Sequence, residues 1–284
     1  MNRIYLKARA KINLTLNVLE KRPDNYHNIE SVFQKISLYD ELFIKKNDND
    51  CLYLECNLKE LENQSNILNK TFNALKKEFP QISGVNVKLV KHIPLQAGLG
   101  GGSTDCASFI LGMNSLFNLN ASEEKLVEVG KSLGADVVPC MYNLVKSEGS
   151  GDIVTKLKSN LTYYILLMKP NYECNTRIMY EKLDSNPNLV QKYNTNDVIN
   201  ILKNGNITDL QGKLYNVFEN VIEEKDELNK IKNDFLFSGA IDTLLSGSGS
   251  CIYGIYETKK DANKAFDYLK SKYNCKIYKC ISCN

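Results

Sequence analysis

The sequence predicts an α+β protein with two domains. Its 284 residues exceed the usual length of one domain and suit two. Strand patterns dominate the first half of the chain, helical patterns follow residue 100, and the chain ends on a strand, a helix and a strand. We expect an N-terminal domain at residues 1–158 and a C-terminal domain at residues 159–284.

Strands are predicted where apolar and polar residues alternate. The first is a half-buried strand in which Asn13, Thr15 and Asn17 alternate with four apolar residues, Ile12, Leu14, Leu16 and Val18. The same character predicts further strands at residues 42–46, 52–56, 85–90, 163–169, 251–256 and 276–281.

Helices are predicted where apolar residues recur every three to four positions. One such run ends at Pro80 and contains Leu68, Phe72, Leu75 and Phe79. A second helix begins near Ser103, and a third stops at Gly134. Helical segments are also expected at residues 176–234 and 262–269.

Composition and charge exclude several classes of protein. Hydrophobic residues make up 43% of the chain and charged residues 24%, as in ordinary globular proteins. The net charge of +3 is too balanced to favour a nucleic-acid or membrane partner. No apolar run approaches the ~20 residues of a membrane span, and charges interrupt the N-terminus where a signal peptide would be apolar. We therefore expect a cytoplasmic protein.

The nine cysteines are scattered, and without a secretion signal they do not predict a disulfide framework. Cys275, Cys280 and Cys283 are spaced like part of an iron–sulfur motif, but a final strand explains this segment better. His27 and His92 are the only histidines, which excludes a histidine-rich metal site. We expect no metal held by protein ligands alone.

The strongest functional signal is a glycine-rich segment at residues 94–104, between a predicted strand and a predicted helix. Glycines let the backbone approach a ligand, and the start of a helix presents unpaired N–H groups to phosphate. The segment lacks the lysine of a Walker A loop and the βαβ context of a Rossmann turn. A phosphate site is favoured over a tightly packed turn. Its residues are Pro94, Leu95, Gln96, Ala97, Gly98, Leu99, Gly100, Gly101, Gly102, Ser103 and Thr104.

Two charged residues each have two interpretations. Lys11 shares one face of the first strand with Asn13. It is either a solvent-facing lysine, the commoner case, or an anion ligand beside an asparagine that holds a hydroxyl. Asp136 follows Gly134 and precedes an apolar run, so it is either a helix N-cap or a general base toward an alcohol.

Two further motifs are also ambiguous. Tyr26 and His27 follow a turn, and they either pack in the loop or hold a flat heterocycle by stacking and hydrogen bonding. The second glycine cluster, at residues 245–251, is either a hairpin-like turn or a ligand contact.

Together these motifs resemble the GHMP kinase superfamily of small-molecule kinases, over about residues 4–257. The pair Tyr26 and His27 indicates the branch that acts on 4-diphosphocytidyl-2-C-methyl-D-erythritol in non-mevalonate isoprenoid biosynthesis. The segments that carry the resemblance are Ala-Lys-Ile-Asn-Leu, Asp-Asn-Tyr-His, Gly-Leu-Gly-Gly-Gly-Ser-Thr-Asp, Gly-Ala-Asp-Val and Leu-Ser-Gly-Ser-Gly-Ser-Cys.

The resemblance implies a two-domain fold with its active site in the cleft between the domains. ATP, accompanied by Mg²⁺, would place its phosphates in the segment 94–104, with Lys91 on the nucleotide side and Ser103 or Thr104 offering an oxygen to the metal. Asp136 would be the catalytic base and Lys11 its charge-stabilising partner. The cytidylyl substrate would contact Asn13, Tyr26, His27, Thr176 and Tyr180.

The chain departs from the family pattern at three places. Arg9 stands where proline is usual, Pro139 comes one residue late, and Tyr180 replaces a frequent phenylalanine. None of these changes removes a catalytic group. The alternatives are a homoserine or mevalonate kinase, or a non-catalytic nucleotide or sugar sensor on the same fold. Tyr26, His27 and Tyr180 argue against the other kinases, whose substrates have no heterocycle.

Overall fold

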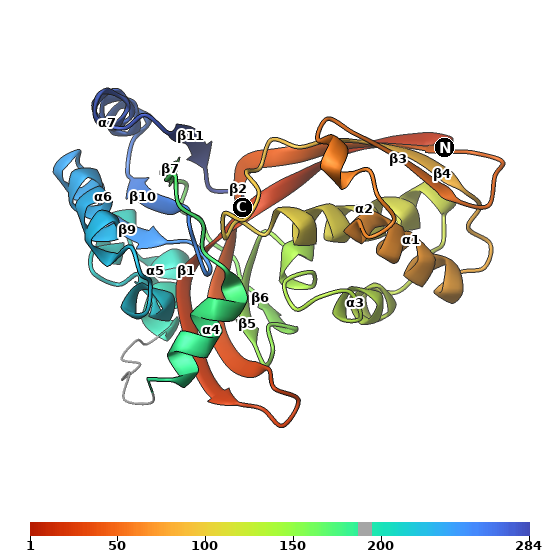
Figure 1. The fold of residues 1–284 in the computed structure, drawn as a ribbon, viewed down its shortest axis with the longest axis horizontal. Helices are drawn as coiled ribbons and strands as arrows, with labels where there is room; N and C mark the ends of the chain where they lie inside the picture. Colours follow the sequence, from red (N-terminus) through yellow and green to blue (C-terminus); the bar gives the residue numbers. More distant parts are fainter. Residues whose placement is uncertain (187–194) are drawn as a thin grey trace. The chain divides into compact units, whose positions relative to one another are not determined.

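The structure is a computed structural model that describes residues 1–186 and 195–284. The chain forms two compact units. Unit 1 comprises residues 1–10, 39–93 and 100–142, and unit 2 comprises residues 11–38, 94–99 and 143–284. Two long strands, β1 (Arg3–Lys21) and β2 (His27–Lys46), contribute residues to both units (Figure 1). The expected boundary after residue 158 divides the chain by sequence and remains a prediction.

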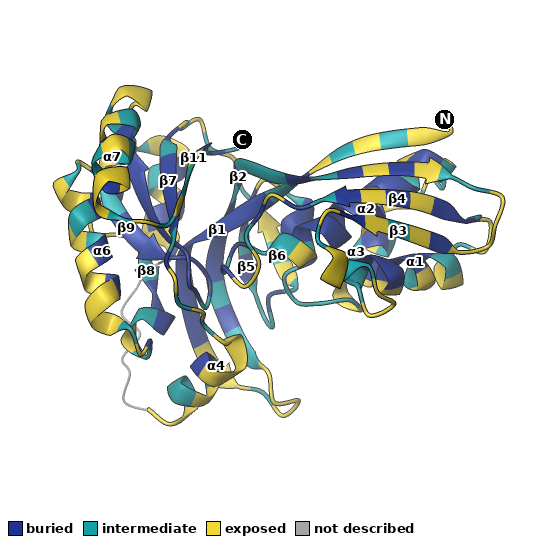
Figure 2. Cartoon of the chain, turned by 45° about the horizontal axis from the view of Figure 1, so that its top comes forward, coloured by how far each residue is buried: buried dark blue, intermediate teal, exposed yellow. Residues whose placement is uncertain are grey.

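Unit 1 is a sheet with helices on one face. Its strands follow the order β3-β4-β2-β1, with β3 (Leu52–Cys56) parallel to β4 (Val85–Val90) and β4 antiparallel to β2. Figure 2 shows exposed and buried residues alternating along β3 and β4. The outward face of the sheet is therefore open to solvent. The helices on the inner face are α1 (Ile67–Glu78), α2 (Gly101–Phe117) and α3 (Glu123–Lys131).

The core of unit 1 lies between this sheet and its helices. Leu75 of α1 and Phe109 of α2 pack with Leu42, Val87 and Leu89 of the sheet, and all five are buried. Burying such side chains contributes about 1.5–3 kcal/mol each. The apolar spacing that predicted α1 in the sequence is the spacing that supplies its buried face.

Unit 2 contains a second, antiparallel sheet in the order β11-β7-β10-β9. Two helices, α6 (Lys225–Phe237) and α7 (Lys259–Lys272), pack on it through residues such as Ile231 and Leu269. The strands of this sheet are β7 (Tyr164–Lys169), β9 (Asp242–Leu245), β10 (Ile252–Tyr256) and β11 (Lys276–Ile281). The other strands and α-helices of the described residues are β5 (Leu144–Glu148), β6 (Ile153–Lys156), α4 (Thr176–Asp184), α5 (Thr195–Asn204) and β8 (Tyr215–Asn216).

Most predicted elements are confirmed, including the strands that became β3, β4, β7, β10 and β11 and the helices α1 and α7. The prediction of helical segments at residues 176–234 is incomplete. This stretch contains the helices α4, α5 and α6, but also the strand β8 and short 3₁₀ helices. The part of that prediction at residues 187–194 lies outside the described residues. In the part of the chain that is described, no helix has the length and apolar character needed to cross a bilayer.

The first strand differs from its prediction, because both of its faces are buried from Lys11 to Val18. Asn13 and Thr15 are tolerated there because their side chains are hydrogen-bonded. Asn13 Nδ2 donates to Ser31 Oγ at 2.8 Å, and Thr15 Oγ1 accepts from the backbone N–H of Val32 at 3.1 Å. These partners come from β2, so the alternation along β1 alone could not reveal them.

Candidate active site

The glycine-rich segment leads into α2, which begins at Gly101, two residues before the predicted start. Gly100 is the N-cap in a left-handed conformation (φ 66°, ψ 26°), and its carbonyl accepts from the N–H of Thr104 at 2.8 Å. Ser103 and Thr104 therefore lie inside the first turn and do not cap it. Among the described residues, no side chain caps the N-terminus of α2 by a hydrogen bond at Gly100. The first backbone N–H groups of α2 are therefore available to an anion.

The first half of this segment packs on the second glycine cluster, and both belong to unit 2. Ser246 Oγ donates to the carbonyl of Gly98 at 3.0 Å, and the N–H of Cys251 donates to the carbonyl of Ala97 at 3.2 Å. The second cluster is the turn between β9 and β10, as the simpler interpretation proposed. It also supports the predicted phosphate segment, which the sequence did not show.

Lys11 is buried, with 4% of its surface exposed, so the solvent-facing interpretation is wrong. Its backbone N–H donates to the carbonyl of Leu99 at 3.1 Å, and its Nζ donates to Asn13 Oδ1 at 2.7 Å. A β-carbon placed on Gly247 would lie 3.4 Å from Lys11 Nζ. The ammonium group therefore lies where the two glycine segments of unit 2 approach each other.

Thr176 also reaches the second glycine cluster. It is the first residue of α4, whose N-cap is Asn175, and its Oγ1 lies 2.7 Å from Ser248 Oγ. Within unit 2, the structure thus brings Lys11, Asn13 and Thr176 to the two glycine segments.

His27 and Tyr180 are brought together as a stacked pair, with ring centroids 5.1 Å apart and an interplanar angle of 22°. His27 Nε2 also lies 2.6 Å from Asp184 Oδ1. Tyr26 is 62% exposed, and its backbone N–H donates to Asp24 Oδ1. The predicted heterocycle site therefore has one partly buried stacked pair and one exposed ring.

Asp184 is a member of this group that the sequence analysis missed. Its second oxygen accepts from Lys21 Nζ at 2.6 Å, and this bond, together with His27, holds the pKa of Asp184 below its usual range. Asp184 lies one helical turn after Tyr180 on α4, so i,i+4 spacing was a signal that could have found it.

Asp136 belongs to unit 1 and lies in the turn between α3 and a 3₁₀ helix, η2 (Pro139–Met141). Its backbone carbonyl accepts from the N–H of Cys140 at 3.3 Å, and its side chain is neither fully buried nor fully exposed. The N-cap position of η2 is Val138, so the N-cap interpretation of Asp136 is wrong for this helix. A general base remains the prediction for this carboxylate.

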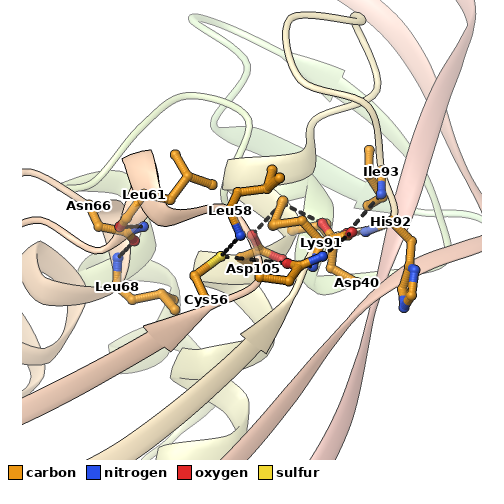
Figure 3. Close-up of polar contacts among 12 residues, drawn as sticks. Asp40, Cys56, Leu58, Leu61, Asn66, Leu68, Lys91, His92, Ile93 and Asp105 are labelled. Atoms are coloured by element: carbon orange, nitrogen blue, oxygen red, sulfur yellow. Dashed lines mark hydrogen bonds and ion pairs between the residues drawn. The ribbon is translucent and has the colours of Figure 1, made fainter.

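Lys91 lies in a buried ion cluster of unit 1. Its Nζ contacts Asp40 Oδ2 and donates to Asp105 Oδ2 at 2.7 Å, and all three side chains are at most 3% exposed (Figure 3). Burial alone would lower the pKa of Lys91, but the two carboxylates outweigh it and raise that pKa. Burial also raises the pKa of Asp105, from 3.8 to about 8, with Lys91 opposing the shift and Asp40 adding to it.

The raised pKa of Asp105 predicts a pH dependence of stability. Between pH 3.8 and about 8 the folded chain keeps a proton on Asp105 that the unfolded chain has released, so the free energy of unfolding falls as pH rises through this interval. Asp105→Asn lacks the titrating group. We expect the stability difference between variant and wild type to change steadily from pH 5 to pH 8 in urea unfolding. If the free energies of unfolding of variant and wild type change in parallel from pH 5 to pH 8, the raised pKa of Asp105 is contradicted.

Comparisons with known proteins place the chain in a family. Residues 66–143 match the GHMP kinases N terminal domain, and residues 200–275 match the GHMP kinases C terminal domain. A solved 4-(cytidine 5'-diphospho)-2C-methyl-D-erythritol kinase aligns over 99% of this chain and 100% of its own, with a TM-score of 0.82 at 23% identity. A homoserine kinase from Cytophaga hutchinsonii aligns over 100% of this chain and 95% of its own, with a TM-score of 0.75 at 16% identity. The chain therefore belongs to the GHMP kinases.

Full-length relatives narrow the family further. A 4-diphosphocytidyl-2-C-methyl-D-erythritol kinase from Acetivibrio thermocellus is 39% identical over 99% of this chain and 100% of the relative. A protein of the same name from Caldicellulosiruptor saccharolyticus is 38% identical over 94% of this chain and 93% of the relative. Within the GHMP kinases, the chain is thus a member of the 4-diphosphocytidyl-2-C-methyl-D-erythritol kinase family.

Proposed function

We propose that the protein transfers the γ-phosphoryl group of ATP to the 2-hydroxyl of 4-diphosphocytidyl-2-C-methyl-D-erythritol, as a step of isoprenoid precursor synthesis. The observation that carries the proposal is the buried ammonium of Lys11, placed among the glycine segments of unit 2. A cation among close backbone amides suits a phosphoryl group on which charge is redistributed. The names of the full-length relatives support the choice of acceptor.

In this proposal the amides at the start of α2 and in the segment 94–100 hold the ATP phosphates, and Lys11 offsets charge on the transferred group. Asp136 accepts the proton of the acceptor hydroxyl. Thr104 Oγ1 is buried and donates to the carbonyl of Arg9 at 2.6 Å, whereas Ser103 is partly exposed. Ser103 is therefore our choice for the hydroxyl that would face Mg²⁺ on the nucleotide, with phosphates and water completing the metal's shell.

The test is a phosphoryl-transfer assay with ATP and three acceptors. We expect transfer to 4-diphosphocytidyl-2-C-methyl-D-erythritol and little to mevalonate or homoserine. Preference for either of the latter would identify another kinase of the family. Nucleotide binding without turnover of any acceptor would indicate a sensor.

Tyr180→Ala is expected to lower kcat/KM by about 5- to 100-fold for cytidylyl and uridylyl forms of the acceptor alike. The reason is that stacking of a base on an aromatic ring stabilises by about 1–3 kcal/mol whatever the base. Discrimination between the bases should come from hydrogen bonds around His27. A change of His27 should therefore reduce the difference in kcat/KM between the cytidylyl and uridylyl acceptors.

Tyr180→Phe is the matched control, since it keeps the ring that stacks on His27 and should behave nearly as wild type. The Tyr180 ring also packs edge-on against Phe218, with the ring centroids 5.0 Å apart. If Tyr180→Ala leaves both kcat/KM values unchanged, the ring has a packing role against His27 and Phe218 and no role in binding the base.

A further inference from the structure

No step of the proposed phosphoryl transfer uses the buried ion cluster of Asp40, Lys91 and Asp105, although the family resemblance puts Lys91 on the nucleotide side. The cluster joins three elements of unit 1, since Asp40 lies on β2, Lys91 directly follows β4 and Asp105 is the fifth residue of α2 (Figure 3). Two carboxyl groups and one ammonium group have been removed from water there, and the raised pKa of Asp105 leaves that carboxyl group protonated near neutral pH. Such a cluster adds little net stability, because desolvating the charges offsets most of their attraction. We therefore look for the role of the cluster in the backbone positions that it fixes.

The cluster fixes the chain immediately before the glycine-rich segment. Asp40 Oδ1 accepts from the backbone N–H of His92 at 2.6 Å and from that of Ile93 at 2.8 Å. The side chain of Asn57 binds both backbone groups of Lys91. Asn57 Oδ1 accepts from the Lys91 N–H at 2.8 Å, and Asn57 Nδ2 donates to the Lys91 carbonyl at 3.2 Å. Residues 91–93 are thus held by three backbone N–H groups and one carbonyl.

The same cluster fixes the chain immediately after the segment. Lys91 Nζ donates to Asp105, four residues into α2, and it lies 3.4 Å from the place where a β-carbon on Gly101 would be. Ile93 Cγ2 lies 3.3 Å from that same point. The first residue of α2 is therefore packed directly against the residues that Asp40 holds.

We propose that the Asp40–Lys91–Asp105 cluster positions the two ends of the ATP-binding segment, and that Lys91 acts on the nucleotide through this support and not by direct contact. The proposal rests on the proposed function only in naming ATP as the ligand of the segment. These are positioning residues. Small displacements of such supports are costly, since a misplacement of about 1 Å can lower a rate by about 10²-fold.

The two carboxylates differ in a way that provides a sharp test. Both oxygens of Asp40 accept hydrogen bonds from donors, so in Asp40→Asn the new NH₂ group must face either the Lys91 ammonium or two backbone N–H groups. In Asp105 only Oδ2 meets Lys91, and among the described residues the buried Oδ1 has no hydrogen-bond partner. In Asp105→Asn the amide can therefore keep its oxygen toward Lys91 and place its NH₂ where no donor opposes it.

The experiment measures the Kd of a non-hydrolysable ATP analogue by calorimetry, without acceptor, for wild type, Asp40→Asn and Asp105→Asn. We expect Asp40→Asn to raise Kd by about 10-fold or more, as for a lost hydrogen bond to a charged group. Asp105→Asn should stay within about twofold of wild type at pH 7. In the transfer assay, Asp40→Asn should raise KM for ATP and leave KM for the acceptor nearly unchanged.

A control separates positioning from general loss of stability. Leu75→Ala removes a fully buried side chain of α1 in the same core, so it should lower Tm without changing the Kd of the analogue. If Asp40→Asn does not fold, Asp105→Ala replaces it, because it removes the oxygen that Lys91 contacts and should raise Kd more than Asp105→Asn.

The proposal is overturned if folded Asp40→Asn binds the analogue as wild type does, if Asp105→Asn is as damaging as Asp40→Asn, or if Leu75→Ala raises Kd equally. Because the analogue is measured without acceptor, these outcomes are independent of which alcohol the enzyme phosphorylates. An error in the proposed acceptor would appear only in the transfer assay.

Discussion

Asp136→Asn is expected to lower kcat by about 10²–10⁴-fold while the Kd for ATP stays near its wild-type value. The amide has nearly the shape of the carboxylate but cannot accept the proton of the acceptor hydroxyl. The residue is partly exposed in a turn of unit 1 and does not occupy the N-cap of the following helix η2. Its carboxylate is therefore not needed to begin that helix.

The measurement is single-turnover phosphoryl transfer together with calorimetric ATP binding, on a variant whose Tm shows that it is folded. Glu128→Gln on α3 is the control, because it neutralises an exposed carboxylate paired with Lys125 at 3.3 Å and should leave kcat unchanged. A folded Asp136→Asn variant with near-normal turnover would remove Asp136 from the mechanism and leave it a structural role.

Local patterns predicted the elements that local forces decide. Apolar spacing and Pro80 locate the strands β3 and β4 and the helix α1, because each of these elements buries one face against a single partner layer. The start of α2 was placed two residues late, because its N-cap is a left-handed glycine and not a serine or threonine. Glycine is only modestly enriched at N-caps, where serine, threonine, asparagine and aspartate lead.

Long-range burial explains what the sequence could not show. Lys11 looked like a surface lysine because a strand of alternating polarity predicts one exposed face, but that face is covered as well. Likewise, Asp40 and Asp105 lie 51 and 14 residues from Lys91, and nothing in the spacing links them. The glycine segment itself was recognisable from its residues, whereas the supports beneath it depend on contacts between distant elements.

Gly98→Ala is expected to weaken ATP binding by at least about 10-fold, because the segment cannot keep its path with a side chain at this position. Gly98 has φ of +70°, and a β-carbon there would lie 1.9 Å from the carbonyl oxygen of Ser246. Either the segment 94–99 or the turn between β9 and β10 must move. That movement would also disturb the Gly98 carbonyl, which now accepts from Ser246 Oγ.

The matched control for this change is Gly212→Ala. Gly212 has nearly the same φ, +68°, but a β-carbon there would have no neighbour within 4 Å. Both variants bear the strain of a left-handed alanine, so a similar loss of stability is expected from that source in each. Only Gly98→Ala adds the collision with Ser246. The difference in the Kd of ATP between the two variants therefore measures the effect of the collision alone, without that of backbone strain. Equal Kd values would show that the packing of Gly98 on Ser246 has no part in nucleotide binding.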